Sequence, residues 1–235
     1  MILKNRLLAF VAAVSLFGSV TAQNNQSGDF KFSANDRNVE VQYAGPFADS
    51  PFSIDGIKLR YFNTDNTALR LRANITSTSS STVTQQENSD SKLLELKKKE
   101  SSFQFMVAPG YEMHFSATNR LSPYIGGEAV IDYLSSSVRT ESQDENAVYY
   151  SKTSNGTDPG YFGFSLNGVA GFDFYVTKSL YLGVEVNYGL TLKSNLSQKT
   201  KSDAKEFKEA EPIKNGGSFS FQPGAIGQYR LGFIF

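Results

Sequence analysis

The chain has 235 residues, with 23 basic and 23 acidic side chains, one His, no Cys and no Trp. An even charge balance without a basic cluster argues against nucleic-acid binding, and a chain without Cys has no disulfide framework and no thiolate metal site. With 19 Phe, 12 Tyr and 19 Gly, the composition favours an aromatic-rich β protein.

The first 22 residues have the three parts of a secretory signal. Lys4 and Arg6 precede an apolar run at residues 7–17, and small residues follow up to Ala22. Because the run is too short to span a membrane as a helix, it predicts a cleaved signal peptide over residues 1–22.

The rest of the chain is expected to form a short periplasmic segment, residues 23–37, and one domain, residues 38–235. It has no later apolar run of helical span length. Export without Cys then indicates the periplasm or outer membrane of a Gram-negative bacterium.

Eight segments alternate apolar with polar or small residues. In the clearest, Phe162 to Val176, aromatic residues lie at both ends and small residues in the middle. A period of two indicates a strand between two unlike environments, and aromatic ends suit the two interfaces of a bilayer. The other segments lie at residues 39–43, 57–61, 69–75, 103–115, 125–133, 182–193 and 219–235. The sequence therefore predicts an all-β fold, an eight-stranded antiparallel up-and-down transmembrane β-barrel.

The connections between these segments alternate in length. Three are long and polar, at residues 78–100, 140–159 and 195–216, and the external connection at residues 48–54 is short. Long external loops and short periplasmic turns are typical of outer-membrane barrels, so both ends of the mature chain are expected in the periplasm. Residues 77–84 either continue the third strand above the membrane or form no regular structure.

Twelve charged residues lie on the polar faces of the segments, six of each sign. An eight-stranded barrel has an interior just wide enough for side chains, and buried charges persist there only in pairs. The sequence predicts an ion-pair network that fills the lumen, formed by Glu40, Lys58, Arg60, Arg70, Arg72, Glu112, Glu128, Asp132, Asp173, Glu185, Lys193 and Arg230.

Two prolines interrupt the expected strands. Pro109 and Pro223 lack the N–H that a strand ladder needs, so each is expected to mark a β-bulge. A bulge is also where a hydrophobic exit through the wall would lie.

Residues with catalytic or metal-binding chemistry are sparse. His114 lies on a polar face near a periplasmic turn without an activated nucleophile beside it, which favours a hydrogen-bonding role over general-base catalysis. The carboxylates could be read as a metal or proton pathway, but the balancing Arg and Lys residues favour ion pairing. We predict no catalytic, metal-binding or cofactor-binding residue.

A soluble eight-stranded barrel such as a lipocalin is the rival to the membrane barrel. It would turn the same pattern inside out, with apolar residues lining a cavity and charges facing water. Loop alternation, strand length and aromatic strand ends favour the membrane barrel.

The chain resembles the OmpA/OmpX-like family of small eight-stranded outer-membrane barrels, including porin-like members of Bacteroidetes. The resemblance rests on the eight segments, on the run from Leu121 to Glu128, and on the terminal residues Tyr229, Leu231, Phe233 and Phe235. It implies that these four residues are the signal read by the outer-membrane assembly machinery, and that outer-membrane lipid and lipopolysaccharide surround the barrel. Because the sequence stops at Phe235, no peptidoglycan-binding domain is expected.

Two functions remain open at this point. The first is a non-catalytic structural or surface-interaction role, in which long loops contact an extracellular partner of unknown identity. The second is a narrow porin-like channel or small-solute transporter, which would need a water path past the charged interior.

Overall fold

The computed structural model describes residues 30–43, 54–87, 93–115, 118–143, 148–203, 209, 211–223 and 228–235. The expected signal peptide and most of the expected periplasmic segment lie outside these residues. No helix in the described ranges is long and apolar enough to cross a membrane. The described strands are β1 (Arg37–Tyr43), β2 (Ile54–Thr64), β3 (Thr67–Glu87), β4 (Leu93–His114), β5 (Leu121–Gln143), β6 (Val148–Ser154), β7 (Tyr161–Tyr175), β8 (Leu180–Asn195), β9 (Lys199–Ser202), β10 (Gly217–Pro223) and β11 (Gln228–Ile234).

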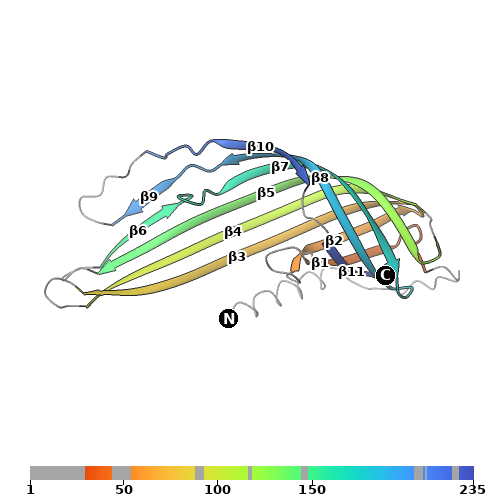
Figure 1. The fold of residues 1–235 in the computed structure, drawn as a ribbon, viewed down its shortest axis with the longest axis horizontal. Helices are drawn as coiled ribbons and strands as arrows, with labels where there is room; N and C mark the ends of the chain where they lie inside the picture. The colour runs from red at the N-terminus through yellow and green to blue at the C-terminus, as the bar shows by residue number, and fades with distance from the viewer. Residues whose placement is uncertain are drawn as a thin grey trace.

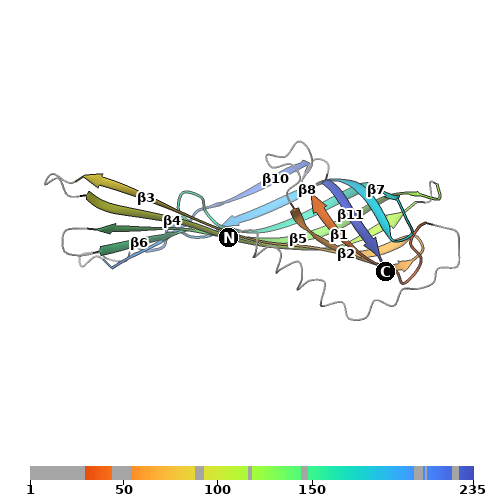
Figure 2. The same cartoon turned by 90° about the horizontal axis from the view of Figure 1, so that it is seen from below.

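Eight of these strands form a closed antiparallel ring in the order β1, β2, β3, β4, β5, β7, β8, β11 (Figure 1). The ring closes where β11 pairs with β1, with Val41 opposite Leu231. Figure 2 shows β11 beside β1 at the barrel end of the molecule. The predicted eight-stranded antiparallel barrel is confirmed.

The alternation of each strand separates an apolar outer wall from a charged interior. Leu166 on β7 is 52% exposed and Leu190 on β8 is 41% exposed, whereas Glu40 and Lys58 are completely buried. A soluble barrel would bury the apolar side and expose the charges. The lipocalin-like arrangement is therefore wrong, and the apolar wall is the surface that a bilayer covers.

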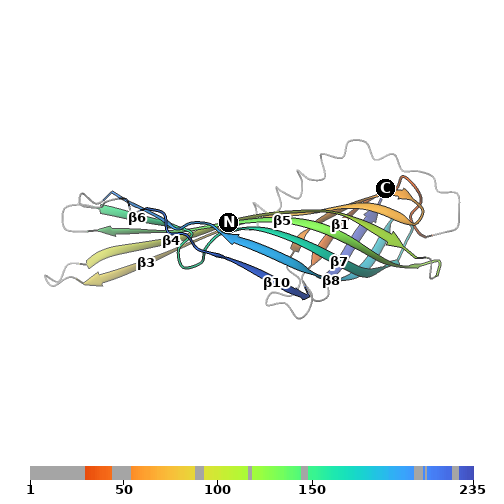
Figure 3. The same ribbon diagram turned by 90° about the horizontal axis from the view of Figure 1, so that it is seen from above.

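Several strands continue far beyond the barrel. The strands β3, β4 and β5 have 21, 22 and 23 residues, about twice the 9–11 residues that cross a membrane. Beyond the wall they pair with one another, β5 also pairs with β6, and β6 pairs with β9 (Figures 1 and 3). We call this part, made of residues 77–87, 93–102, 135–143, β6 and β9, the protruding sheet.

The protruding sheet replaces much of the three predicted polar loops, so those loop predictions are wrong over residues 78–87, 93–100, 140–143, 148–154 and 199–202. Many of these segments are rich in Ser, Thr and Val, which accept extended backbone, and each segment has a neighbouring strand to pair with. The register between β3 and β4 is unbroken from Thr67 opposite Met113 to Glu87 opposite Leu93. For residues 77–84, the structure selects continuation of the strand.

The bulge predicted at Pro109 is wrong. Pro109 lies opposite Leu71 in the unbroken β3–β4 register. On the other side, pairing with β5 stops after Val107 opposite Ile131 and resumes in the same register with Gly110 opposite Glu128. The N–H that Pro109 lacks therefore leaves a short gap in the β4–β5 hydrogen-bond ladder, without an extra residue in either strand.

The bulge predicted at Pro223 falls at the edge of the described residues, because residues 224–227, which join β10 to β11, lie outside them. Pro223 lies opposite Tyr188, and Gln228 lies opposite Glu185. Five steps along the terminal strand therefore match three steps along β8. The two strands are therefore offset by two residues, an even number, so β10 and β11 present their apolar residues to the same side.

Candidate functional site in the barrel lumen

Ten of the predicted interior charges form one buried cluster, which we call the lumen network. Each has at most 8% of its surface exposed, and the five acidic and five basic side chains balance. The members are Glu40, Lys58, Arg60, Arg70, Arg72, Glu112, Glu128, Asp173, Glu185 and Arg230.

Two ion pairs of the lumen network cross the barrel from wall to wall. Arg70 on β3 makes two bonds to Glu185 on β8, with Nη1–Oε2 and Nη2–Oε1 distances of 3.0 and 2.9 Å. Arg60 on β2 donates from Nη2 to Oδ2 of Asp173 on β7 at 2.8 Å. The strands of each pair lie on opposite sides of the ring, so these side chains occupy the centre of the lumen.

Other contacts connect these crossings into one network. Lys58 Nζ lies 3.0 Å from Glu40, 3.2 Å from Glu185 and 3.5 Å from Glu112. Arg230 reaches Glu40 at 3.2 Å and Asp173 at 3.0 Å. Each charge of the lumen network contacts at least one opposite charge, which is the condition for ionised groups to remain in a low-dielectric interior.

Aromatic and imidazole groups satisfy further atoms of the lumen network. Tyr181 donates its hydroxyl to Glu40 at 2.7 Å, and Tyr124 donates to Glu185. His114 Nε2 lies 3.2 Å from Glu112, and Nδ1 lies 3.1 Å from the Ser122 hydroxyl. Our sequence prediction missed both Tyr residues as network members, although their parity in the strands places them on the inner face.

Asp132 and Lys193 lie outside the lumen network, which corrects the prediction of twelve members. Asp132 accepts hydrogen bonds from Gln104 at 3.0 Å and from the Tyr161 hydroxyl at 2.7 Å, and Lys193 lies over the Tyr161 ring at 4.1 Å. Within the described part of the chain neither forms an ion pair. Both are only partly buried, so water can satisfy them without an opposite charge.

An aromatic stack closes the barrel at the end away from the protruding sheet. Phe32 is 6% exposed and stacks on Phe62 with ring centroids 3.6 Å apart. The same ring meets His114 edge to face at 4.6 Å. The backbone of this segment is fixed because Asn35 N–H donates to Phe62 O at 2.7 Å. Sequence patterning missed Phe32, because it precedes the first alternating segment.

The terminal residues predicted as an assembly signal complete the ring. Leu231 and Phe233 pair with Val41 and Val39 on β1, and the Phe235 N–H donates to the carbonyl of Arg37 at 3.0 Å. The side chain of Phe233 is 50% exposed on the outer wall. Tyr229 is described only by its backbone.

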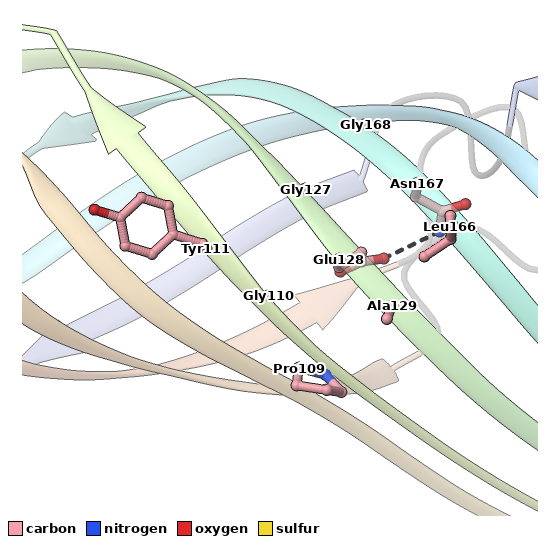
Figure 4. Close-up of a pocket in the computed structure, with 9 residues that line it drawn as sticks. All are labelled: Pro109, Gly110, Tyr111, Gly127, Glu128, Ala129, Leu166, Asn167 and Gly168. Carbon is pink, nitrogen blue, oxygen red and sulfur yellow. Dashed lines mark hydrogen bonds between the residues drawn. The ribbon is translucent and has the colours of Figure 1, made fainter.

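A shallow hollow of about 510 Å³ lies in the wall near Pro109 (Figure 4). Pro109, Gly127 and Gly168 leave it open because they present little or no side chain. Behind it, Glu128 accepts a hydrogen bond from Asn167 at 3.2 Å, drawn as the dashed line in Figure 4. The Glu128 carboxylate also pairs with Arg70 and Arg72, so the lumen network backs this part of the wall.

A closed antiparallel barrel with an apolar outer wall is the architecture of outer-membrane β-barrel proteins. The sequence matches the putative OmpA-OmpF-like porin family over residues 48–201, and the chain belongs to that family. The expected family resemblance is confirmed, and the protein is an outer-membrane β-barrel.

Two solved structures are similar to this chain. The N-terminal β-barrel domain of Pseudomonas aeruginosa OprF is 15% identical, with a TM-score of 0.37, and the match covers 87% of this chain and 100% of that chain. Acinetobacter baumannii CarO2 is 10% identical, with a TM-score of 0.40 and the same coverage of 87% and 100%. A search of curated proteins gives no significant match.

Proposed function

We propose that this protein is a non-catalytic outer-membrane barrel that holds the protruding sheet at the cell surface for contact with a partner. The observation that carries the proposal is the continuity of β3, β4 and β5. These strands supply Arg70, Glu112 and Glu128 to the lumen network and continue without a break in register into the protruding sheet. A filled barrel is a rigid base, and binding residues are often displayed on such a base.

The orientation of the chain supports this proposal. The end of β11 lies at the barrel end away from the protruding sheet (Figure 1). With the chain end in the periplasm, as the alternation of long and short connections predicts, the protruding sheet extends outside the cell.

The free edge of β3 is the part of the protruding sheet best suited to a partner. The strand β3 pairs with β2 only as far as Ala73, and among the described residues no strand covers its edge from Ile75 onward. From Ile75 to Gln86 this edge contains no charge and no Pro, the two devices that usually block edge-to-edge pairing. An extended segment of a partner could add to it as a further strand.

Shortening the β3–β4 hairpin tests the surface role. In the variant, residues 78–100 are replaced by an Asn-Gly turn, and heat-modifiable gel migration shows that the barrel still folds. Adhesion of cells that display each protein to a panel of protein-coated surfaces is then compared. The proposal expects adhesion above empty-vector cells for the full chain and its loss in the variant. Equal adhesion by both proteins contradicts it.

A narrow channel or small-solute transporter is the second candidate function. The family description names porins, and Asp132, Lys193 and Gln104 form a partly exposed polar region above the lumen network. Transport would require the lumen network and the Phe32 stack to rearrange. A conductance measurement separates this candidate from the surface role.

A further inference from the structure

One face of the protruding sheet carries a row of basic side chains at matching positions on four strands. Lys99 on β4 lies opposite Arg139 on β5, Arg139 lies opposite Lys152 on β6, and Lys152 lies opposite Lys201 on β9. All four are exposed. We call these four residues the basic row. Adjacent strands lie about 4.8 Å apart, so the four charges fall within about 15 Å, and like charges on neighbouring strands destabilise a sheet.

Three members of the basic row line a small hollow. Lys99, Arg139 and Lys152, together with the hydroxyl-bearing Ser101 and Ser137, surround a volume of about 170 Å³. Cationic groups and hydroxyls are the donors that bind phosphate oxygens. An anion bound here would offset the mutual repulsion of the row.

Two contacts hold the Arg139 guanidinium in place beside Lys99 and Lys152. Its Nε lies 2.9 Å from Glu141, and its guanidinium lies 4.6 Å from the Tyr150 ring. Across the described ranges, Lys99 and Lys152 contact no carboxylate, and Lys201 reaches Glu209 only at 3.9 Å. Three of the four charges therefore remain weakly compensated.

The opposite face of the same sheet lacks this imbalance. Lys98 is next to Lys99 on β4 and therefore lies on the opposite face, where it pairs with Glu100 at 2.7 Å. The excess of positive charge thus belongs to one face rather than to the strand as a whole.

That face is continuous with the lipid-covered wall. By strand alternation, Lys99 lies on the same side as Phe103 and Phe105, which are 45% and 37% exposed on the outer wall. Lys99 is four residues beyond Phe103. With a rise of about 3.4 Å per residue and a strand tilt of about 40°, it lies about 10 Å further out along the membrane normal. This depth corresponds to the head groups of the outer leaflet rather than to bulk water.

We infer that the basic row binds the phosphate groups of the outer-leaflet glycolipid, lipopolysaccharide. The bound phosphate occupies the hollow beside Lys99, Arg139 and Lys152, while the acyl chains of the same molecule cover the wall below. This site uses the face of the protruding sheet, whereas the proposed partner contact uses the β3 edge. The two can therefore fail independently.

Binding of purified lipopolysaccharide to the full chain in detergent micelles tests the inference. The test variant combines Lys99→Gln, Arg139→Gln and Lys152→Gln, and the matched control is Lys98→Gln on the opposite face. A basic residue near an anionic membrane surface contributes about fivefold in affinity, so the triple variant should bind about a hundredfold more weakly. Lys98→Gln should bind like the unchanged protein.

Three further measurements make the result specific. Heat-modifiable migration shows that each variant is folded, and Lys99→Arg with Lys152→Arg should keep the affinity. Lipopolysaccharide from which the phosphates have been removed should bind the unchanged protein as weakly as the triple variant binds the intact glycolipid. Equal binding of intact and dephosphorylated lipopolysaccharide, or an unchanged affinity of the triple variant, overturns the inference. If inorganic phosphate alone binds as tightly as the glycolipid, the membrane source is wrong.

Discussion

Arg70 and Glu185 join opposite walls of the barrel through two parallel charge-assisted hydrogen bonds, 3.0 and 2.9 Å long. Because their strands, β3 and β8, are diametrically placed in the ring, this one pair occupies the width of the lumen. The stack of Phe32 on Phe62 fills the barrel end beyond it. The lumen of the barrel is therefore packed with charged and aromatic side chains rather than open.

Removing Arg70 should strongly destabilise the barrel. The Arg70→Ala variant leaves Glu185 and Glu112 short of a partner in a buried site, and breaking a buried pair in this way costs about 3–5 kcal/mol. Urea unfolding in phospholipid vesicles measures the free energy of unfolding. The control is Lys98→Gln, in a pair whose side chains are 53% and 56% exposed, where about 1 kcal/mol or less is expected. A similar small loss for Arg70→Ala would show that the lumen network is not a stabilising core.

Removing the Phe32 ring should open the end of the lumen. The natural sequence has no Cys, so Ser122→Cys introduces a single buried thiol beside His114. Adding Phe32→Ala should raise the rate of labelling by a small thiol reagent at least about tenfold. This increase corresponds to a decrease of about 1.4 kcal/mol in the free energy of local opening. An exposed Ser179→Cys thiol serves as the control and should label equally fast with or without Phe32. Unchanged labelling of Ser122→Cys would contradict a plugging role for this ring.

Gly232 is required where β11 passes the Tyr181 ring. A Cβ at this position would collide with the ring of Tyr181, which is fully buried and donates to Glu40. We expect Gly232→Ala to lower the free energy of unfolding by about 1–3 kcal/mol, as overpacking does. Gly168→Ala is the matched control, because the nearest neighbour of a Cβ there would be the Tyr188 carbonyl oxygen, at 3.8 Å. Equal stability of both variants would argue against close packing of Tyr181.

The outer wall should reject charge at mid-depth. Val186 lies on β8 among lipid-facing residues and is 49% exposed. Val186→Arg should cost about 2–4 kcal/mol in a bilayer, since an Arg side chain at the midplane faces hydrocarbon. Thr84→Arg, on the protruding sheet, should change stability by less than about 0.5 kcal/mol. Folding yields and unfolding in vesicles compare the two, and an equally small effect at Val186 would place that surface outside the bilayer.

The barrel and most of its interior could be predicted because strand alternation is a local property. The alternation from Phe162 to Val176 was enough to place Asp173 inside and Phe164 outside. Ten of the predicted charges meet inside the ring, and two do not. Whether an inward-facing charge joins the lumen network depends on its position along the strand, and the period of two gives only the face on which it lies.

The stack of Phe32 on Phe62 and the protruding sheet could not be predicted in the same way. Phe32 reaches the lumen because Asn35 bonds to the backbone of Phe62, a contact between segments that shows no pattern in the sequence. The segments that form the protruding sheet are polar on both faces, so they carry no strong alternation. Their strand structure comes from pairing with the neighbouring strands rather than from the period of two.

Planar-bilayer conductance of the full-length protein tests the central claim, the closed lumen, most directly. Heat-modifiable migration of the same sample first shows that the inserted protein is folded. A lumen closed by the Arg70–Glu185 pair and the Phe32 stack predicts a current no different from that of a protein-free bilayer. Reproducible single-channel steps from the folded protein would contradict the closed lumen and favour the channel.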